Sequence, residues 1–154
     1  MSLKQLYQQT IKQHSQSPIG ANAQFTPTHQ AEGYNPSCGD ELDIYLQLEP
    51  TKSASTTQIK AIGFHSDACA ICTASASMLC EHSEGKTVEE LQKCVDDLSI
   101  SIKNRTTLSE SLCTSSPLNC LTAVSAYPSR INCALLPWQT LGRALQTAQK
   151  STQS

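Results

Sequence analysis

The sequence predicts an α+β protein in which a small antiparallel sheet of about three strands packs against several helices. Stretches with alternating apolar side chains lie in the first half of the chain, and stretches with helical periodicity dominate the second half. Strands that precede helices, rather than alternating with them, are typical of this class. The 154 residues contain no internal repeat and no linker, so one domain is expected over 1–154.

The first half of the chain contains the predicted strands. Residues 3–14 are expected to form an amphipathic helix, because apolar side chains recur there every three to four positions. Prolines and a glycine follow, and a short strand is predicted near 28–34. The segment LDIYLQLE, residues 42–49, alternates apolar and polar side chains as a half-buried strand does. A polar loop separates it from an apolar strand at 59–64, so the two are expected to form an antiparallel hairpin.

The second half is predicted to be mainly helical. A helix should begin at Ala70 and stop at Gly85, and a second amphipathic helix should occupy 87–103. Residues 104–119 are rich in Ser and Thr and are expected to form a loop. A last helix is predicted with Pro137 in its first turn, where proline is tolerated. Residues 150–154 are expected to be a disordered tail.

Composition narrows the classes of function. The net charge is −2, so the chain carries no strongly basic surface for nucleic acid or an anionic membrane. No apolar run of about 18 residues exists, and the polar N-terminus does not resemble a signal peptide. We therefore expect a cytoplasmic protein, in which the eight cysteines are reduced and serve as packing residues, metal ligands or reactive thiols.

The segment CAICTASASMLC begins with a Cys-x-x-Cys pair, Cys69 and Cys72. Such a pair is found in redox dithiols and in zinc sites, but no thioredoxin-like context and no second pair accompany it. Cys69 stands at a strand-to-helix junction, where a thiol faces the positive end of the helix dipole. Cys72 lies one turn further on and is expected to pack, with a role as an alternate ligand or resolving thiol as the other interpretation.

Two other segments carry groups able to bind a metal. In NPSCGD, an Asn-Pro turn and Gly39 should present Cys38 and Asp40 to the same side, which suits half of a metal site or an ordinary strand-entry turn. In YPSRINCALLPW, Cys133 lies between Arg130 and Trp138. By itself a lone cysteine ahead of a helix is usually a packing residue.

Together these segments resemble the NifU N-terminal family of iron–sulfur cluster assembly proteins, which includes IscU and SufU. The resemblance rests on NPSCGD, on F-x4-C-x-I-x2-ASASM and on P-x-RI-x-CA-x-L-x-W, and it extends from residue 6 to about 145. The opening helix also matches, at Tyr7, Ile11, His14 and Pro18. A SufU/IscU-like fold is therefore expected.

The resemblance implies a four-ligand site made of Cys38, Asp40, Cys69 and Cys133. It is similar to the SufU branch in the spacing between Cys69 and Cys133 and in Arg130 and Trp138, whereas Asn132, Ser66 and Ala68 depart from the family pattern. A SufU-like protein holds Zn²⁺ at this site and accepts persulfide sulfur from a pyridoxal-phosphate cysteine desulfurase. The resemblance therefore implies that this chain is a sulfur-accepting partner of the desulfurase rather than a stand-alone enzyme.

The same resemblance implies roles for single residues and an alternative function. Cys133 is expected to accept the persulfide, and Arg130 to contact a partner or to be an ordinary solvated arginine. The alternative is an IscU-like scaffold that assembles a [2Fe–2S] cluster on the same ligands and passes it to other iron–sulfur assembly proteins. A third interpretation is a closed, inert zinc module that mediates a protein contact.

Overall fold

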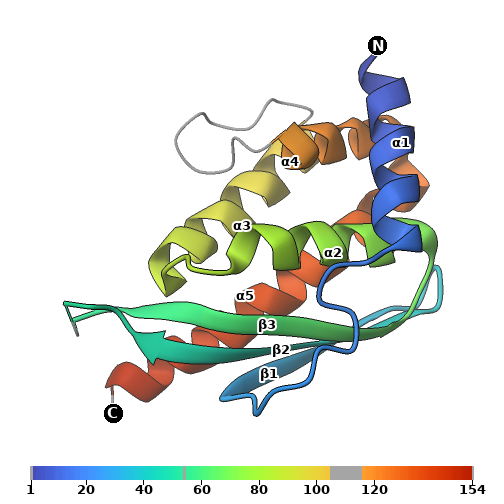
Figure 1. Ribbon diagram of the computed structural model, residues 1–154. Helices are drawn as coiled ribbons and strands as arrows, with labels where there is room; N and C mark the ends of the chain where they lie inside the picture. Colours follow the sequence, from blue (N-terminus) through green and yellow to red (C-terminus); the bar gives the residue numbers. More distant parts are fainter. Residues whose placement is uncertain (1, 54, 105–115, 154) are drawn as a thin grey trace.

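The computed structural model describes residues 2–53, 55–104 and 116–153, and Figure 1 shows the arrangement of their helices and strands. The elements are α1 (Leu3–Gln16), β1 (His29–Asn35), β2 (Asp40–Pro50), β3 (Thr57–Asp67), α2 (Ala70–Ser83), α3 (Val88–Asn104), α4 (Ser116–Leu121), two short 3-10 helices η1 (Thr122–Ala126) and η2 (Pro128–Arg130), and α5 (Ile131–Gln153). The three strands form one antiparallel sheet in the order β1-β2-β3, with the helices on one face. This confirms the predicted α+β class.

Strand β2 runs through the middle of the sheet and shows why its sequence alternates. Leu42, Ile44 and Leu46 point toward the helices and are buried, while Asp43 between them is exposed. Tyr45 is also buried, although it lies on the outer face, because the segment between α1 and β1 crosses that face. The predicted hairpin of β2 and β3 is present, with a bulge in its register after Gln47.

Helix α2 is the central helix, and it is buried on more than one face. Every residue from 74 to 80 is buried, because α2 packs against α1, α5 and β3 at once. Small Ala and Ser side chains allow this close approach. The end of α1 is fixed to α2 through Ser77, whose hydroxyl lies 2.8 Å from His14 Nδ1 and accepts the Ile19 N–H at 2.8 Å.

Two predicted boundaries were wrong. Helix α5 begins at Ile131, so Pro137 lies inside the helix and not, as the sequence predicted, in its first turn. Burial of Ala134, Leu135 and Leu136 stabilises the extra turns and outweighs the hydrogen bond that Pro137 cannot donate. Helix α4 begins inside the segment expected to be a loop, 104–119, of which residues 105–115 lie outside the described residues.

Helix α5 extends to Gln153, and Ser154 lies outside the described residues. Disorder of the tail, 150–154, stays a prediction. The single-domain organisation also stays a prediction, and we adopt it as a proposal. Within the described part of the chain, no helix is both long and apolar enough to cross a membrane.

Candidate metal centre

Two predicted ligands are held by the turn between β1 and β2. Asn35 and Asp40 face each other as the last pair of that ladder, so the intervening residues must turn tightly. Gly39 has a φ of 69°, in the left-handed region that glycine adopts without a Cβ penalty. The turn leaves Cys38 exposed and buries Asp40 completely.

Asp40 is a buried carboxylate with a partner for each oxygen. Its Oδ1 accepts the backbone N–H of Cys69 at 2.9 Å, and its Oδ2 accepts Asn35 Nδ2 at 3.1 Å. Burial raises the pKa of Asp40, but these hydrogen bonds and those from the Cys133 and Cys69 thiols outweigh burial and hold that pKa below its ordinary value. Asp40 therefore presents a negative charge and connects the turn to the start of α2.

Cys69 is the N-cap residue of α2. Its backbone is extended, and its side chain makes no capping hydrogen bond to the helix. The thiol instead interacts with Asp40 and with Cys133. The strand-to-helix junction predicted for this residue is thus present, and it directs the thiol toward the other candidate ligands.

Cys133 lies in the first turn of α5 and is completely buried. Its Sγ is 3.2 Å from Cys38 Sγ and 3.5 Å from Asn35 Nδ2. Burial, followed by the neighbouring Cys38, Asp40 and Cys69, raises the pKa of the Cys133 thiol. A cation bound among these groups would oppose that effect, because it favours the deprotonated thiol.

Among the residues that the structure describes, one group of metal-ligating side chains meets the distance expected of a metal site. Its ligand atoms, from Cys38, Asp40 and Cys133, all lie within 4.8 Å of one another. Two sulfurs and a carboxylate oxygen suit zinc, and sulfur-rich donor sets also hold iron–sulfur clusters. Cys69 is next to this group but is not part of it. The structure thus brings three of the four predicted ligands together, and ligation by all four stays a prediction.

Arg130 lies at the edge of the centre. It ends η2, is exposed, and places Nη1 3.9 Å from Cys38 Sγ. Its pKa is raised, first by a hydrogen bond to Cys133 and then by the nearby thiols of Cys38 and Cys69. Arg130 is therefore a positive charge beside the exposed thiol, and its role as a partner contact stays a prediction.

The remaining cysteines differ in their surroundings. Cys72 is completely buried in α2, and burial raises the pKa of its thiol. It follows Cys69 by three residues in α2 and is outside the compact ligand group, so its role as an alternate thiol stays a prediction. Burial raises the pKa of Cys80 to about 12. Cys94 is disulfide-bonded, which corrects the expectation that all eight cysteines are reduced.

Sequence reasoning missed the side chains that position the centre. Asn35 was interpreted only as a turn former, yet its amide donates to Asp40 and to Cys133. Ser75 was likewise missed. Its hydroxyl accepts Trp138 Nε1 at 3.0 Å and donates to the Ala134 carbonyl at 2.6 Å. This pair of hydrogen bonds fixes the start of α5 against α2. The one feature of the sequence that could have indicated this role is that Asn35, a polar residue, lies within the metal-binding motif NPSCGD.

Comparisons with known proteins agree with this geometry. The family model for the NifU-like N-terminal domain matches residues 6–146. The iron–sulfur cluster assembly scaffold protein IscU of Thermotoga maritima is 29% identical over 156 residues, which cover 95% of this chain and 96% of that protein. The zinc-dependent sulfurtransferase SufU of Bacillus subtilis is 25% identical over 147 residues, 94% of this chain and 92% of that protein.

A solved structure is also similar. The crystal structure described as FiSufU, an iron–sulfur cluster assembly scaffold protein for the SUF system from Fervidobacterium islandicum AW-1, has a TM-score of 0.72 and 28% sequence identity. The match covers 88% of this chain and 93% of that chain. Because relatives named IscU and SufU occur at similar identity, the comparisons do not assign the chain to either branch.

Proposed function

The chain belongs to the family of NifU-like N-terminal domains, as its motifs predicted, and on this premise we propose that it is an iron–sulfur cluster assembly protein of the SufU type. It would accept sulfur from a pyridoxal-phosphate cysteine desulfurase and work with other iron–sulfur assembly proteins in the cytoplasm. The observation that carries the proposal is the convergence of Cys38, Asp40 and Cys133 within 4.8 Å, with Cys69 beside them.

The donor set supports Zn²⁺ as the resident metal. Cys38, Asp40, Cys69 and Cys133 would hold it, and their thiols and carboxylate match the ligands that tetrahedral zinc prefers. When bound, zinc would keep the thiols deprotonated and limit their reactivity. Asp40, the single oxygen donor of the four, is held by hydrogen bonds to Asn35 and to the backbone of Cys69, and these fix the geometry of the turn whether or not a metal is present.

The proposed sulfur transfer is a thiol–persulfide exchange at Cys133. The Cys133 thiolate forms a bond to the outer sulfur of the desulfurase persulfide, the sulfur–sulfur bond of that persulfide breaks, and the desulfurase cysteine leaves as a thiolate that takes up the proton that Cys133 had released. Cys133 is completely buried, and Cys38 covers it at 3.2 Å. Transfer therefore requires the turn that carries Cys38 to move, and Arg130 would then face the entering anionic sulfur.

Desulfurase turnover tests this proposal. We expect the zinc-loaded protein to stimulate the cysteine desulfurase from the same cell, and the Cys133→Ser variant to lose the stimulation. Cys120→Ser is a matched control, because Cys120 is a buried thiol beside Thr10, away from the centre, and serine preserves that hydrogen bond. Normal stimulation by Cys133→Ser, with Cys120→Ser unchanged, would show that another residue accepts the sulfur.

The second candidate function is an IscU-like scaffold for a [2Fe–2S] cluster. It is favoured by the sulfur-rich donor set and by the relatives named as scaffolds. Anaerobic reconstitution with iron and sulfide should then give a stable visible absorption spectrum that Cys69→Ser loses. If the protein neither stimulates a desulfurase nor holds a cluster, and its zinc exchanges slowly, the third interpretation, an inert zinc module, applies.

A further inference from the structure

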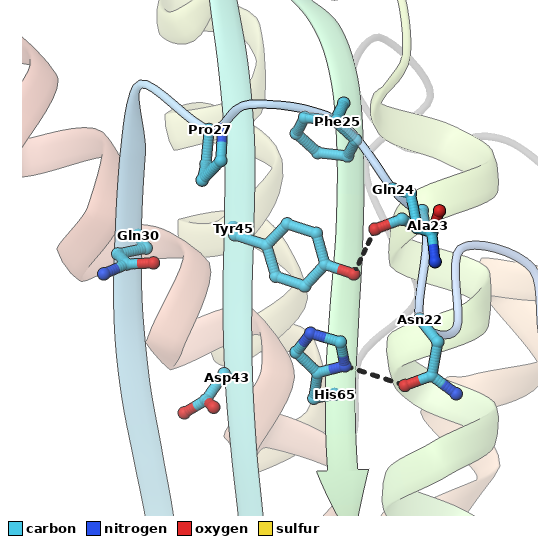
Figure 2. Close-up of a pocket in the computed structure, with 9 residues that line it drawn as sticks. All are labelled: Asn22, Ala23, Gln24, Phe25, Pro27, Gln30, Asp43, Tyr45 and His65. Carbon is cyan, nitrogen blue, oxygen red and sulfur yellow. Dashed lines mark hydrogen bonds between the residues drawn. The ribbon is translucent and has the colours of Figure 1, made fainter.

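The outer face of the sheet, away from the helices, carries a recess that the proposed function does not use. It lies where the segment between α1 and β1 crosses the strands, and Figure 2 shows the residues around it. Its volume is about 500 Å³. Nine residues line it: Asn22, Ala23, Gln24, Phe25, Pro27, Gln30, Asp43, Tyr45 and His65. This volume is within the range of sites that bind small molecules or single side chains.

Aromatic rings form the floor of the recess. The Tyr45 ring stacks on the His65 ring with centroids 4.9 Å apart, and it contacts the Phe25 ring at 5.2 Å. Hydrogen bonds to the crossing segment hold two of these rings. Tyr45 Oη donates to the Ala23 carbonyl at 2.7 Å, and His65 Nδ1 donates to Asn22 Oδ1 at 2.7 Å. The rings are therefore held in place before any ligand arrives.

These hydrogen bonds use up donors and leave acceptors. Because His65 donates through Nδ1, its neutral ring offers Nε2 as an acceptor. Asp43 adds an exposed carboxylate next to the rings, and Gln30 adds an amide oxygen. Aromatic faces are also electron-rich. Asn22, Gln24 and Gln30 also bring amide donors, but Asp43 is the one side chain with a fixed charge among the nine lining residues, so the recess favours a flat or compact cation that donates hydrogen bonds.

Negative charge continues beyond the recess along the same face. Residues paired across the strands point to the same side of a sheet. One row contains Glu32, Asp43 and His65, and the next contains Tyr34, Glu41 and Asp67. The six residues of these two rows include four carboxylates and no lysine or arginine, and the cation that contacts them from another element is Arg143 of α5, which donates to the Glu32 carbonyl. Asp67 lies two residues before Cys69, so the acidic rows connect the recess with the metal centre.

We propose that this acidic face docks a basic segment of a partner protein, and that the recess receives an arginine side chain of that segment. The planar guanidinium would pack against the exposed His65 ring and the half-buried Phe25 ring while donating to Asp43, an arrangement that arginine makes better than lysine does. The neighbouring carboxylates would contact the rest of the segment. The inference goes beyond the proposed function and does not depend on the metal or on sulfur transfer.

A peptide titration followed by amide NMR shifts tests the inference. The probe is a short capped peptide with two adjacent arginines, and peptides with two lysines or two glutamates are the comparisons. We expect the arginine peptide to shift the amides of Phe25, Tyr45 and His65, the lysine peptide to bind more weakly, and the glutamate peptide to have no effect. Asp43→Asn should raise the dissociation constant about fivefold, as loss of one exposed ion pair would.

The control removes one carboxylate elsewhere. Glu89 is exposed in the first turn of α3, on the helical side of the sheet, so Glu89→Gln matches the charge change of Asp43→Asn. Binding should be unchanged in Glu89→Gln. Three results would overturn the inference: no shifts at millimolar peptide, equal weakening by the two substitutions, or equally tight binding of free arginine, which would mark a small-molecule site. If Asp43→Asn binds the peptide more weakly but still stimulates the desulfurase normally, peptide docking is independent of the proposed sulfur transfer.

Discussion

At the scale of single residues, the metal centre depends on side chains that are not themselves predicted ligands. Asn35 is buried, and its one amide nitrogen reaches both Asp40 and Cys133, which belong to distant parts of the chain. Hydrogen bonds of this kind orient metal ligands and fix their charge. The arrangement explains how Asp40 keeps its charge although it is completely buried.

Whether the metal has two or three thiolate ligands depends on Cys69. Its thiol interacts with Asp40 and Cys133, yet it lies outside the compact ligand group. Cobalt substituted for zinc reports thiolate ligands through sulfur-to-cobalt charge-transfer absorption. If Cys69 binds the metal, Cys69→Ser should remove about one third of that absorption, since two thiolates of three remain. Unchanged absorption, with Cys72→Ser reducing it instead, would identify Cys72 as the ligand.

At the scale of elements, the position of Cys133 depends on how closely α5 approaches β1. Gly33 of β1 makes this approach possible, because a Cβ there would collide with Thr140 Oγ1 and lie 3.1 Å from Leu136 Cδ1. The Thr140 hydroxyl cannot move away without losing its hydrogen bond to the Leu136 carbonyl. The helix would have to shift from the strand, and Cys133 with it.

We therefore expect Gly33→Ala to lower the free energy of unfolding by about 1–3 kcal/mol, the usual cost of an overpacked contact. Gly142→Ala is the matched control, since its Cβ would meet Val95 at an ordinary 3.5 Å and alanine favours helix. That variant should be as stable as the original protein or slightly more so. Urea unfolding measures both variants, and equal stability of the two would mean that α5 does not press on β1.

Elements were predictable from the sequence where a single packing interface sets the pattern. The alternation in β2 and the periodicity of α3 reflect one buried face each, and both predictions were confirmed. Helix α2 is enclosed by several elements, so its burial leaves no periodic pattern. The predicted start of α5 was wrong because a proline such as Pro137 is locally typical of the first turn of a helix. The helix begins earlier because the preceding turn is buried, which is a tertiary effect.

The candidate centre was predictable to a similar extent. The family motifs pointed to Cys38, Asp40, Cys69 and Cys133, and the structure gathers the first two and the last. Contacts between residues far apart in the chain, such as that of Asn35 with Cys133, have no local signature in a single sequence. The same holds for the disulfide bond of Cys94 and for the recess on the outer face, which exists only where the crossing segment meets the sheet.

At the scale of the whole molecule, the centre joins three parts of the chain that are otherwise separate. Cys38 lies in the β1–β2 turn, Cys69 at the start of α2 and Cys133 at the start of α5. A metal held by all three binds only the folded arrangement, because the unfolded chain does not hold these ligands together. Metal binding should therefore stabilise the entire fold rather than the turn alone.

Thermal unfolding with and without a chelator measures this coupling. We expect zinc to raise the melting temperature, with a stabilisation of about 4 kcal/mol when free zinc is about a thousand times its dissociation constant. Cys38→Ser should leave the metal-free protein almost unchanged, because Cys38 is exposed, but should remove most of the increase caused by zinc. Cys120→Ser should retain that increase. If Cys38→Ser gains as much from zinc as the original protein does, zinc binds elsewhere and the three segments are joined by packing alone.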